Sequence, residues 1–313
     1  MKKIIACAIF FTILFPSLPL NENGMFHSPK YFFIKKAAHI ADKAMEAAKN
    51  TLSKSFSQRI TEKDVVIAIE KSLKENGSGE FFAAFSPIVA SGKDSSSPNG
   101  VPDNDNYNLI EPGEVVVIDI EARYLGFCSE ITRTFFIGEP TTEMKKIYST
   151  VLEAQEAAIK KVELFKPVKE VDKEARSIIE KNGYGDAFIH ATGHGLGMHR
   201  YELPIISSKS MGIFLPGEVV AIEPGIYLEG KYGMRIEDDV AVFLHGQEVL
   251  THYPKDLKDV IIKEEQEKAV KMEEVSKKSY SPNISWGGYT LLFLLVGIAT
   301  AILFYIEYRR KRW

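Results

Sequence analysis

The sequence predicts an α+β domain built from two similar halves with pseudo-twofold symmetry. The stretch PGEVVVID at residues 112–119 returns almost unchanged as PGEVVAIE at residues 216–223. Each copy joins a Pro-Gly turn to an apolar strand that ends on a carboxylate, which packing alone does not require. Two helical patterns precede the strands in each half, so the order helix, helix, strands occurs twice along residues 22–263.

The four helices are predicted from apolar residues that recur three and four positions apart. In the first half they cover residues 30–50 and 61–73, and Thr61 is the expected N-cap of the second of these. In the second half they cover residues 142–163 and 169–183. The chain is 45% hydrophobic, which is enough for a sizeable core, and its formal net charge of −3 does not indicate a nucleic-acid partner.

A β-hairpin in the first half carries two acids. In EVVVIDIEARYLGFCSEITRTFFI, two strand-like runs flank RYLG, and a tip at Tyr124 and Leu125 would pair Asp119 with Glu130. Directly paired residues point to the same face of a hairpin, although a slip of one residue would separate them. Two carboxylates that face each other repel, and a bound cation removes that cost. The hairpin therefore indicates a cation site.

The second half adds two more acids and a group of histidines. Glu223 precedes a turn and Glu237 follows it, so both are expected on facing strands. Between the hairpins, HATGHGLGMHRYELP contains His190, His194 and His199, with glycines that let the backbone approach another group closely. A single histidine is more often a satisfied polar residue than a ligand, but the glycines and the four acids favour a ligand here. One imidazole with four carboxylates suits two hard divalent cations and lacks the thiolates of a structural zinc site.

The two ends of the chain predict export and anchoring. Residues 1–21 contain two lysines and then an uncharged run of twelve residues, which is typical of a signal peptide; a buried N-terminal helix is the alternative. Residues 286–306 carry no charge and are long enough to form a transmembrane helix, between a charged stalk at 264–285 and a basic tail at 307–313. These features predict a single-pass protein of the cell membrane, with its folded domain extracytoplasmic and its C-terminus cytoplasmic.

Four motifs follow one another along the chain: DIEARYLGFCSEITRTF, HATGHGLG, EPG and RIEDD. Between about Phe32 and Asp259, they resemble the motifs of the methionine aminopeptidase, Xaa-Pro aminopeptidase and prolidase family. The segment SEITRTF is more similar to the Xaa-Pro aminopeptidase branch than to the methionine aminopeptidases. The resemblance implies that the domain has the pita-bread (creatinase/aminopeptidase) fold.

The resemblance also implies a ligand set for two divalent metal ions. Asp119 falls where a terminal ligand of one ion stands, and Glu130 and Glu237 fall where carboxylates bridge the two ions. His194 and Glu223 fall where the other ion is held. The implied metal is manganese or cobalt, with zinc or iron as alternatives.

Roles in catalysis and substrate binding follow from the same resemblance. Glu223 is implied as the general base that acts on the attacking water. His190 is implied as a residue that contacts the substrate and stabilises the tetrahedral intermediate. Arg235 stands two residues before Glu237, where we expect it to border the substrate site and to orient a ligand carboxylate.

Four positions depart from the usual family pattern. Glu130 stands in place of an aspartate and Glu121 in place of a glycine, whereas Tyr201 and Asn99 stand where histidines usually contact the substrate. Tyrosine can donate a hydrogen bond to a carbonyl, but its pKa of about 10 makes it a poor proton shuttle at neutral pH. If this stretch is extended, His199 would present its ring on the same face as Tyr201.

Two functions are consistent with these residues. The first is a membrane-anchored, extracytoplasmic, dinuclear-metal exopeptidase that removes N-terminal residues from peptides of the Xaa-Pro type. The second is a pita-bread protein that binds metal or peptide without turnover. The five ligand positions all keep metal-binding side chains, which favours the first function, and the loss of two accessory histidines favours the second. The expected partners are a peptide and the membrane.

Overall fold

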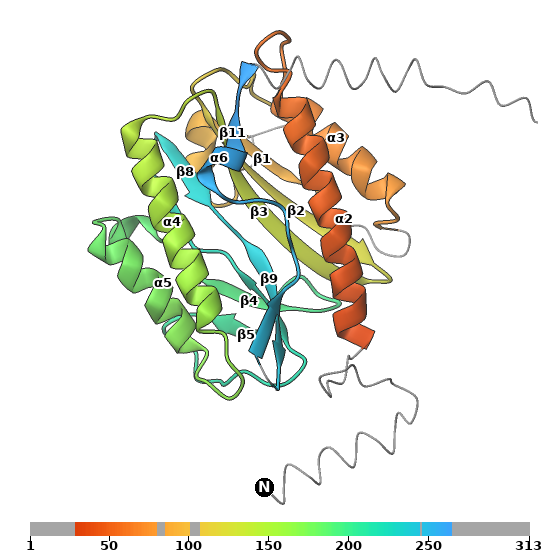
Figure 1. Ribbon diagram of the computed structural model, residues 1–313, viewed down its shortest axis with the longest axis vertical. Coiled ribbons are helices and arrows are strands. Elements are labelled where there is room, and N and C mark those ends of the chain that lie inside the picture. The colour runs from red at the N-terminus through yellow and green to blue at the C-terminus, as the bar shows by residue number, and fades with distance from the viewer. Residues whose placement is uncertain (1–28, 80–84, 101–106, 245, 265–313) are drawn as a thin grey trace, which may run out of the picture. The chain divides into compact units, whose positions relative to one another are not determined.

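Two sheets and a two-stranded ribbon form the centre of the protein, in a computed structural model that describes residues 29–79, 85–100, 107–244 and 246–264 (Figure 1). The first sheet has the strand order β1-β2-β3-β11 and the second has the order β10-β9-β6-β4-β5. The first sheet contains β1 (Ile88–Ser91), β2 (Val115–Tyr124), β3 (Phe127–Ile137) and β11 (Ile261–Ile262). The second contains β4 (Gly193–Leu196), β5 (Glu202–Ile206), β6 (Val219–Ile222), β9 (Asp238–Phe243) and β10 (Gly246–Val249). The ribbon pairs β7 (Gly225–Leu228) with β8 (Tyr232–Arg235).

Four long helices cover these strands in two pairs (Figure 1). Helices α2 (Pro29–Leu52) and α3 (Glu62–Glu75) belong to the first half, and α4 (Thr142–Lys160) and α5 (Lys169–Lys181) to the second. Helix α2 packs on β2 and β3, and α4 contacts β6, β7 and β8. The two predicted helix pairs are therefore confirmed. Shorter elements are the 3-10 turns η1 (Gly92–Ser96) and η3 (Gly185–Ala187) and the helix α6 (Leu257–Val260).

Local chemistry explains where the first helices begin and how closely they pack. Thr61 is the N-cap of α3, as predicted, because its hydroxyl accepts from the N–H of Asp64 while the Asp64 carboxylate accepts from the N–H of Thr61. On α2, the inward face includes a row of small residues that are fully buried, which lets the helix axis lie close to the sheet. These residues are Ala37, Ala41, Ala44 and Ala48.

The repeated Pro-Gly-Glu segment forms the same turn twice. Gly113 and Gly217 have φ angles of 93° and 83°, a region that strongly favours glycine. In each copy, the carboxylate of the following glutamate, Glu114 or Glu218, accepts a hydrogen bond from the backbone N–H three residues before it. The turn leads directly into β2 in the first half and toward β6 in the second. The sequence repeat is therefore a structural repeat, and it delivers an acid to the end of β6 and into the middle of β2.

The register of the first hairpin differs from the prediction. The tip is formed by Leu125 and Gly126, both with positive φ, so Asp119 pairs with Thr132 and not with Glu130. This arrangement shifts the pairing by two positions. Because side chains alternate with a period of two, Asp119 and Glu130 still lie on the same face. The predicted pairing was wrong, but the predicted face was right.

Several sequence predictions concern residues outside the described ranges. These are the signal peptide at 1–21, the stalk at 264–285 beyond its first residue, the transmembrane helix at 286–306 and the basic tail at 307–313. Among the residues that the structure does describe, no helix is both long and apolar enough to cross a bilayer.

Candidate metal centre

Five side chains that the sequence suggested as metal ligands converge between the two halves. Asp119 comes from β2, Glu130 from β3 and His194 from β4, while Glu223 follows β6 and Glu237 precedes β9. Because β6 and β9 pair Ile222 with Asp238, Glu223 and Glu237 occupy the next facing positions, as predicted. The two halves are joined at this point by a β-bridge between Thr132 and Glu237.

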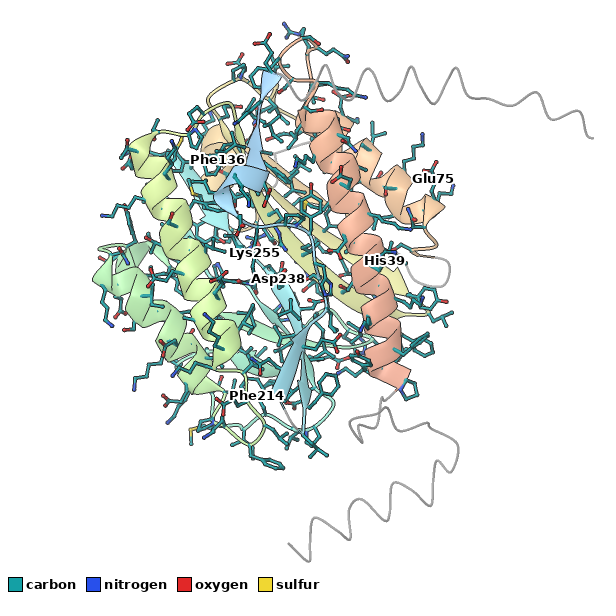
Figure 2. The ribbon with its side chains drawn as sticks, in the orientation of Figure 1. His39, Glu75, Phe136, Phe214, Asp238 and Lys255 are labelled. Carbon is teal, nitrogen blue, oxygen red and sulfur yellow. The ribbon has the colours of Figure 1, made fainter. Side chains whose placement is uncertain are left out.

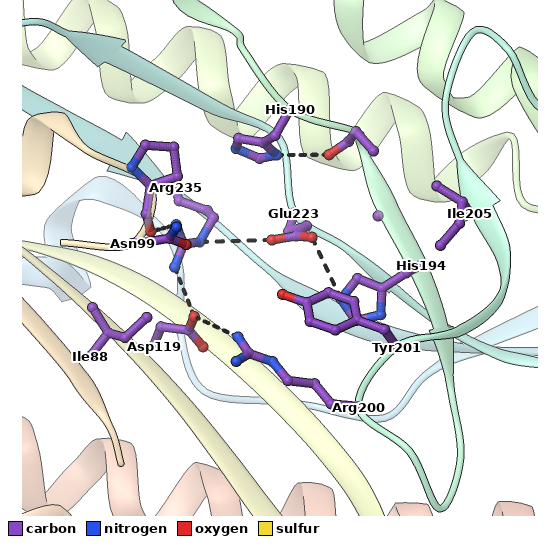
Figure 3. A pocket seen from close by; sticks show the side chains of 13 residues that line it. Ile88, Asn99, Asp119, His190, His194, Arg200, Tyr201, Ile205, Glu223 and Arg235 are labelled. Carbon is purple, nitrogen blue, oxygen red and sulfur yellow. Dashed lines mark hydrogen bonds and ion pairs between the residues drawn. The ribbon is translucent and has the colours of Figure 1, made fainter. Parts of the chain in front are cut away.

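The ligand atoms lie close enough to share a cation. Glu130, His194 and Glu237 each offer one atom, and these three atoms lie within 4.8 Å of one another. Nε2 of His194 lies 3.3 Å from Oε2 of Glu130. It lies 3.7 Å from Oε1 of Glu223 (Figure 3). Three of the four acids are buried, and the fourth, Glu223, is largely buried.

The electrostatics of this group fit a divalent cation. Burial raises the pKa of Glu130 well above its ordinary value, and the carboxylates of Glu237 and Asp119 raise it further. Burial likewise raises the pKa of Glu237, with Glu223 and Asp119 adding to the effect. Oδ1 of Asp119 is buried without a hydrogen-bond donor, and Oε1 of Glu130 is buried without a hydrogen bond of regular geometry. Buried carboxylate oxygens without donors are costly, and a divalent ion satisfies them.

The tautomer of His194 suits a metal ligand. Its Nδ1 lies 3.1 Å from the carbonyl oxygen of Gly195, which can only accept, so Nδ1 carries the proton. Nε2 therefore presents a lone pair to Glu130 and Glu223. Burial also lowers the pKa of His194, which keeps the ring neutral. Gly193 and Gly195 allow this approach, because a side chain at either position would collide with the neighbouring strands β6 and β5.

A second layer of contacts passes through Arg235. Its NH2 group donates to Oδ2 of Asp119 at 2.8 Å, and its NH1 group donates to the hydroxyl of Tyr227 at 3.0 Å. The Tyr227 hydroxyl lies 2.9 Å from Nε2 of His190, and Nδ1 of His190 lies 2.8 Å from the carbonyl of Ala191. Because that carbonyl accepts, Nδ1 of His190 is protonated and Tyr227 donates to Nε2. Burial lowers the pKa of His190 to about 4, so the ring is neutral at physiological pH.

Residues that the sequence analysis missed hold the segment that carries the ligand Glu237. Arg133 is fully buried and donates to the carbonyl of Glu237 at 2.6 Å and to the carboxylate of Asp238 at 2.7 Å. Lys255 reaches the same carboxylate at 2.6 Å (Figure 2). Burial would raise the pKa of Asp238, but Arg133 and Lys255 together hold it below its ordinary value. The signal for this network was the acid next to Glu237, whose cationic partners lie far away in the sequence.

The carboxylate of Asp239 positions the other bridging candidate. It accepts from the backbone N–H of Glu130 at 3.2 Å and from the hydroxyl of Ser129 at 2.5 Å. The three acids of the motif RIEDD therefore have different roles. Glu237 points into the metal group, Asp238 holds Arg133, which donates to the carbonyl of Glu237, and Asp239 holds the backbone N–H of Glu130.

A cavity of about 200 Å³ opens onto the metal group. Among the predicted substrate-binding residues, Asn99, His190, Tyr201 and Arg235 line it (Figure 3). His199 does not, because residues 197–201 form a series of bends and not the extended strand on which that expectation depended.

Arg200 is the lining residue that the sequence analysis did not consider. Its Nε lies 2.7 Å from Oε1 of Glu130, and its NH2 group lies 3.8 Å from Oδ2 of Asp119. A basic residue next to Tyr201 and after the Gly-rich segment was the available signal. This signal could not be interpreted from the sequence, because the position of the Arg200 side chain beside the acids depends on the fold of its loop.

The fold and the site together define a metal-binding protein of the pita-bread class. More particularly, the chain belongs to metallopeptidase family M24, since residues 33–243 match the model of that family. The similarity to Xaa-Pro peptidases supports the pita-bread fold that the resemblance implied. It also supports a place near the Xaa-Pro branch of the family.

Similar proteins include both curated sequences and solved structures. An uncharacterized peptidase of Staphylococcus aureus is 41% identical over 222 residues, which make up 71% of this chain and 61% of that protein. The prolidase from Pyrococcus furiosus is 39% identical with a TM-score of 0.66, over 72% of this chain and 64% of that one. The Xaa-Pro dipeptidase from Bacillus anthracis is 38% identical with a TM-score of 0.68, over 75% and 63%. The chain thus spans about three fifths of the length of the curated relatives it matches.

Proposed function

We propose that this protein is a metal-dependent exopeptidase that removes the N-terminal residue from peptides of the Xaa-Pro type. The observation that carries the proposal is the convergence of four acids and His194 from both halves, with Oδ1 of Asp119 buried and without a donor. The names of the similar solved structures, prolidase and Xaa-Pro dipeptidase, support the substrate class.

We propose that two divalent ions bind to the five side chains, with manganese or cobalt as the first candidates and zinc or iron as the next. Asp119, Glu130 and Glu237 would hold one ion, and His194 and Glu223 would complete the site of the other, with Glu130 and Glu237 shared. When bound, such ions lower the pKa of water and polarise a peptide carbonyl. Glu130 is one methylene longer than aspartate, and metal analysis of the purified protein tests whether both ions still bind.

The protein's own groups supply the proton transfers. Glu223, at the edge of the metal group, is placed to take a proton from water and return it to the leaving amine. In the metal-free protein, burial raises its pKa to about 7, although Arg235 attracts its charged form. The Tyr201 hydroxyl, whose pKa burial raises, remains a neutral donor at the cavity rim for the substrate carbonyl. His190 accepts from Tyr227 through Nε2, so donating a hydrogen bond from Nε2 to the substrate would require both the release of that contact and a change of tautomer.

The test uses full-length protein in detergent, loaded with manganese, and follows release of the first residue from short Xaa-Pro peptides. We expect metal-dependent release that is lost in Glu237→Ala. The second candidate function, metal or peptide binding without turnover, is favoured by Tyr201 and Asn99 standing in place of histidines. Two bound metal ions without release from any peptide would establish that alternative.

We also propose that the protein is anchored in the cell membrane with its folded domain outside the cytoplasm. This proposal rests on the apolar run within residues 1–21, the uncharged residues 286–306 and the basic tail at 307–313. Protease added to intact cells should remove the domain and leave a short protected fragment that contains the tail. A domain that is fully protected would mean that the orientation is inverted.

A further inference from the structure

Two arginines approach Asp119 from different directions, and they are held in different ways (Figure 3). Arg235 has a hydrogen-bond partner for each of its guanidinium nitrogens, and its NH2 group donates to Asp119 at 2.8 Å. Its side chain is only 4% exposed. Arg235 is therefore a permanent part of the site.

Arg200 meets the same group of acids more loosely. Its Nε lies 2.7 Å from Oε1 of Glu130, and its NH2 group lies 3.8 Å from Oδ2 of Asp119. Within the described ranges, Nε is buried but makes no hydrogen bond of regular geometry. Arg200 thus stabilises the two carboxylates mainly as a nearby positive charge, and another cation at the same carboxylates would do so equally.

The acids that Arg200 contacts are ligands of one particular ion in the proposed metal centre. Oε2 of Glu130 faces Nε2 of His194 at 3.3 Å, whereas Oε1 of the same carboxylate faces Arg200. Glu130 thus presents one oxygen to a ligand proposed for one ion and the other oxygen to Arg200. The other ion was proposed to bind Asp119 and Glu130, which are the two acids beside Arg200.

The net charge of the group leads to the same ion. With all four acids ionised, four carboxylates and two guanidinium groups leave two negative charges, which a single divalent ion balances. A second divalent ion would leave two positive charges in a largely buried site, where uncompensated charge is costly. Without Arg200, the second ion would leave only one positive charge.

The Arg200 side chain is able to move away when an ion takes its acids. It belongs to residues 197–201, which form bends and not a strand, and it is 29% exposed at the wall of the cavity. Its guanidinium also lies over the ring of Phe85, 3.9 Å from the centroid, and this attraction does not depend on the acids.

We propose that Arg200 competes with the metal ion that Asp119 and Glu130 hold, and so makes this ion bind more weakly than the ion at His194. This inference rests on the proposed peptidase function and adds a regulation of the same metal centre to it. The concentration of free metal ion would decide how much of the protein carries both ions.

The test is a calorimetric titration of metal-free, full-length protein in detergent with manganese. We expect the unmodified protein to bind one ion tightly and a second more weakly. Arg200→Met keeps the length of the side chain without its charge and should tighten the weaker ion about 10- to 100-fold, because a nearby positive charge is removed. Arg200→Gln, which is also neutral, should do the same. Arg200→Lys keeps the charge and should bind this ion about as weakly as the unmodified protein.

A second background shows which ion is affected. Asp119→Asn removes a charged ligand of the weaker ion and leaves the ion at His194. Adding Arg200→Met to this background should change the affinity of the remaining ion much less than Arg200→Met alone changes that of the weaker ion. The exposed Arg59→Met is the control for the loss of an arginine and should leave both affinities unchanged.

Three results would overturn the proposal. The first is that Arg200→Met and Arg200→Gln bind the weaker ion no more tightly than the unmodified protein. The second is that Arg200→Lys gains as much affinity as they do. The third is an equal gain for the remaining ion in the Asp119→Asn background. If the unmodified protein binds a single ion throughout the titration, Arg200→Met should gain a second one, and the absence of that gain would equally contradict the proposal.

These titrations need no peptide, which keeps the inference distinct from the proposed activity. If manganese-loaded protein cleaves no peptide, the proposed function fails, and the metal affinities still test Arg200. If peptides are cleaved but the neutral substitutions of Arg200 change no metal affinity, only the competition by Arg200 is wrong.

Discussion

The hydroxyl of Thr132 donates a 2.7 Å hydrogen bond to Oε2 of Glu237, and the N–H of Glu237 donates to the carbonyl of Thr132 at 3.1 Å. Thr132 lies on β3 of the first half and directly opposite Asp119, whereas Glu237 belongs to the second half. The two halves are thus joined at the carboxylates themselves. The geometry of the candidate metal group depends on this junction.

Replacing Thr132 should therefore weaken metal binding. Thr132→Val keeps the shape but removes the hydroxyl, and we expect manganese affinity to fall about 10-fold or more because a ligand carboxylate loses the group that orients it. The buried carboxylate also loses a donor, which should lower the free energy of unfolding by about 1–3 kcal/mol.

Titration calorimetry and urea unfolding measure these two effects. Thr150→Val is the matched control, because Thr150 is equally buried on α4 and its hydroxyl donates only to the carbonyl of Lys146. A Thr132→Val protein that binds manganese as tightly as the unmodified protein would show that the junction does not orient Glu237.

Removing Glu130 tests whether this longer carboxylate still bridges two ions. We expect Glu130→Ala to bind at most one manganese ion per chain tightly, because the buried group would lose an oxygen ligand that both ions share. Metal analysis after dialysis gives the occupancy, and the exposed Glu111→Ala serves as the control. Undiminished occupancy of both sites in Glu130→Ala would refute the bridging role.

The metal-free protein should lose stability as the pH rises through the range in which its buried acids ionise. Burial raises the pKa of Glu223 from an ordinary value of 4.5 to about 7, and those of Glu130 and Glu237 well above 4.5. Such groups bind protons more tightly in the folded than in the unfolded state. Their contribution to stability is complete below pH 4.5 and is lost as the pH rises through their folded-state pKa values, which for Glu223 is about 7.

A divalent ion takes the place of those protons, so manganese should raise Tm more at about pH 7 than at about pH 5. Thermal unfolding with manganese and with EDTA across this range gives the difference. In Glu130→Gln, which has no charge to bury, the metal-free Tm should depend less on pH. A manganese effect of the same size at both pH values would contradict the expectation.

The buried pair of Arg133 and Asp238 should matter to stability far more than the surface pairs. Arg133→Met removes the cation but leaves Asp238 buried, and we expect the free energy of unfolding to fall by about 3–5 kcal/mol. Lys71→Ala, which breaks the exposed 3.9 Å pair with Glu75 on α3, should cost less than about 0.5 kcal/mol. Urea unfolding of both variants decides the question, and equal costs would mean that Lys255 compensates for the loss of Arg133.

Much of the fold could be read from local patterns in the sequence. Helix periodicity, the Thr61 cap and the repeated Pro-Gly-Glu turn depend on residues within one or two turns of each other, so their signals lie close together in the chain. The face on which Asp119 and Glu130 lie was also predictable, because the alternation of a strand survives a shift of two positions.

The register of the first hairpin depended on which two residues form its tip. Leu125 and Gly126 take the tip because glycine readily adopts positive φ, whereas a tip at Tyr124 and Leu125 would place two bulky residues there. The glycine in RYLG was the available signal for this register.

The sequence by itself determined which side chains form the candidate site. These are four acids contributed by the two similar halves of the domain and one histidine in a glycine-rich segment. Only the tertiary structure decided how the charges of those acids are compensated, because electrostatic partners are set by distance in space. Arg235 and Arg200 both border Asp119, yet Arg235 has a hydrogen-bond partner for each guanidinium nitrogen, whereas Arg200 meets Glu130 and Asp119 as ion pairs. Nothing in the local sequence of either arginine distinguishes them. They are distinguished by the packing of Arg200 against Glu130 on β3 and against the ring of Phe85.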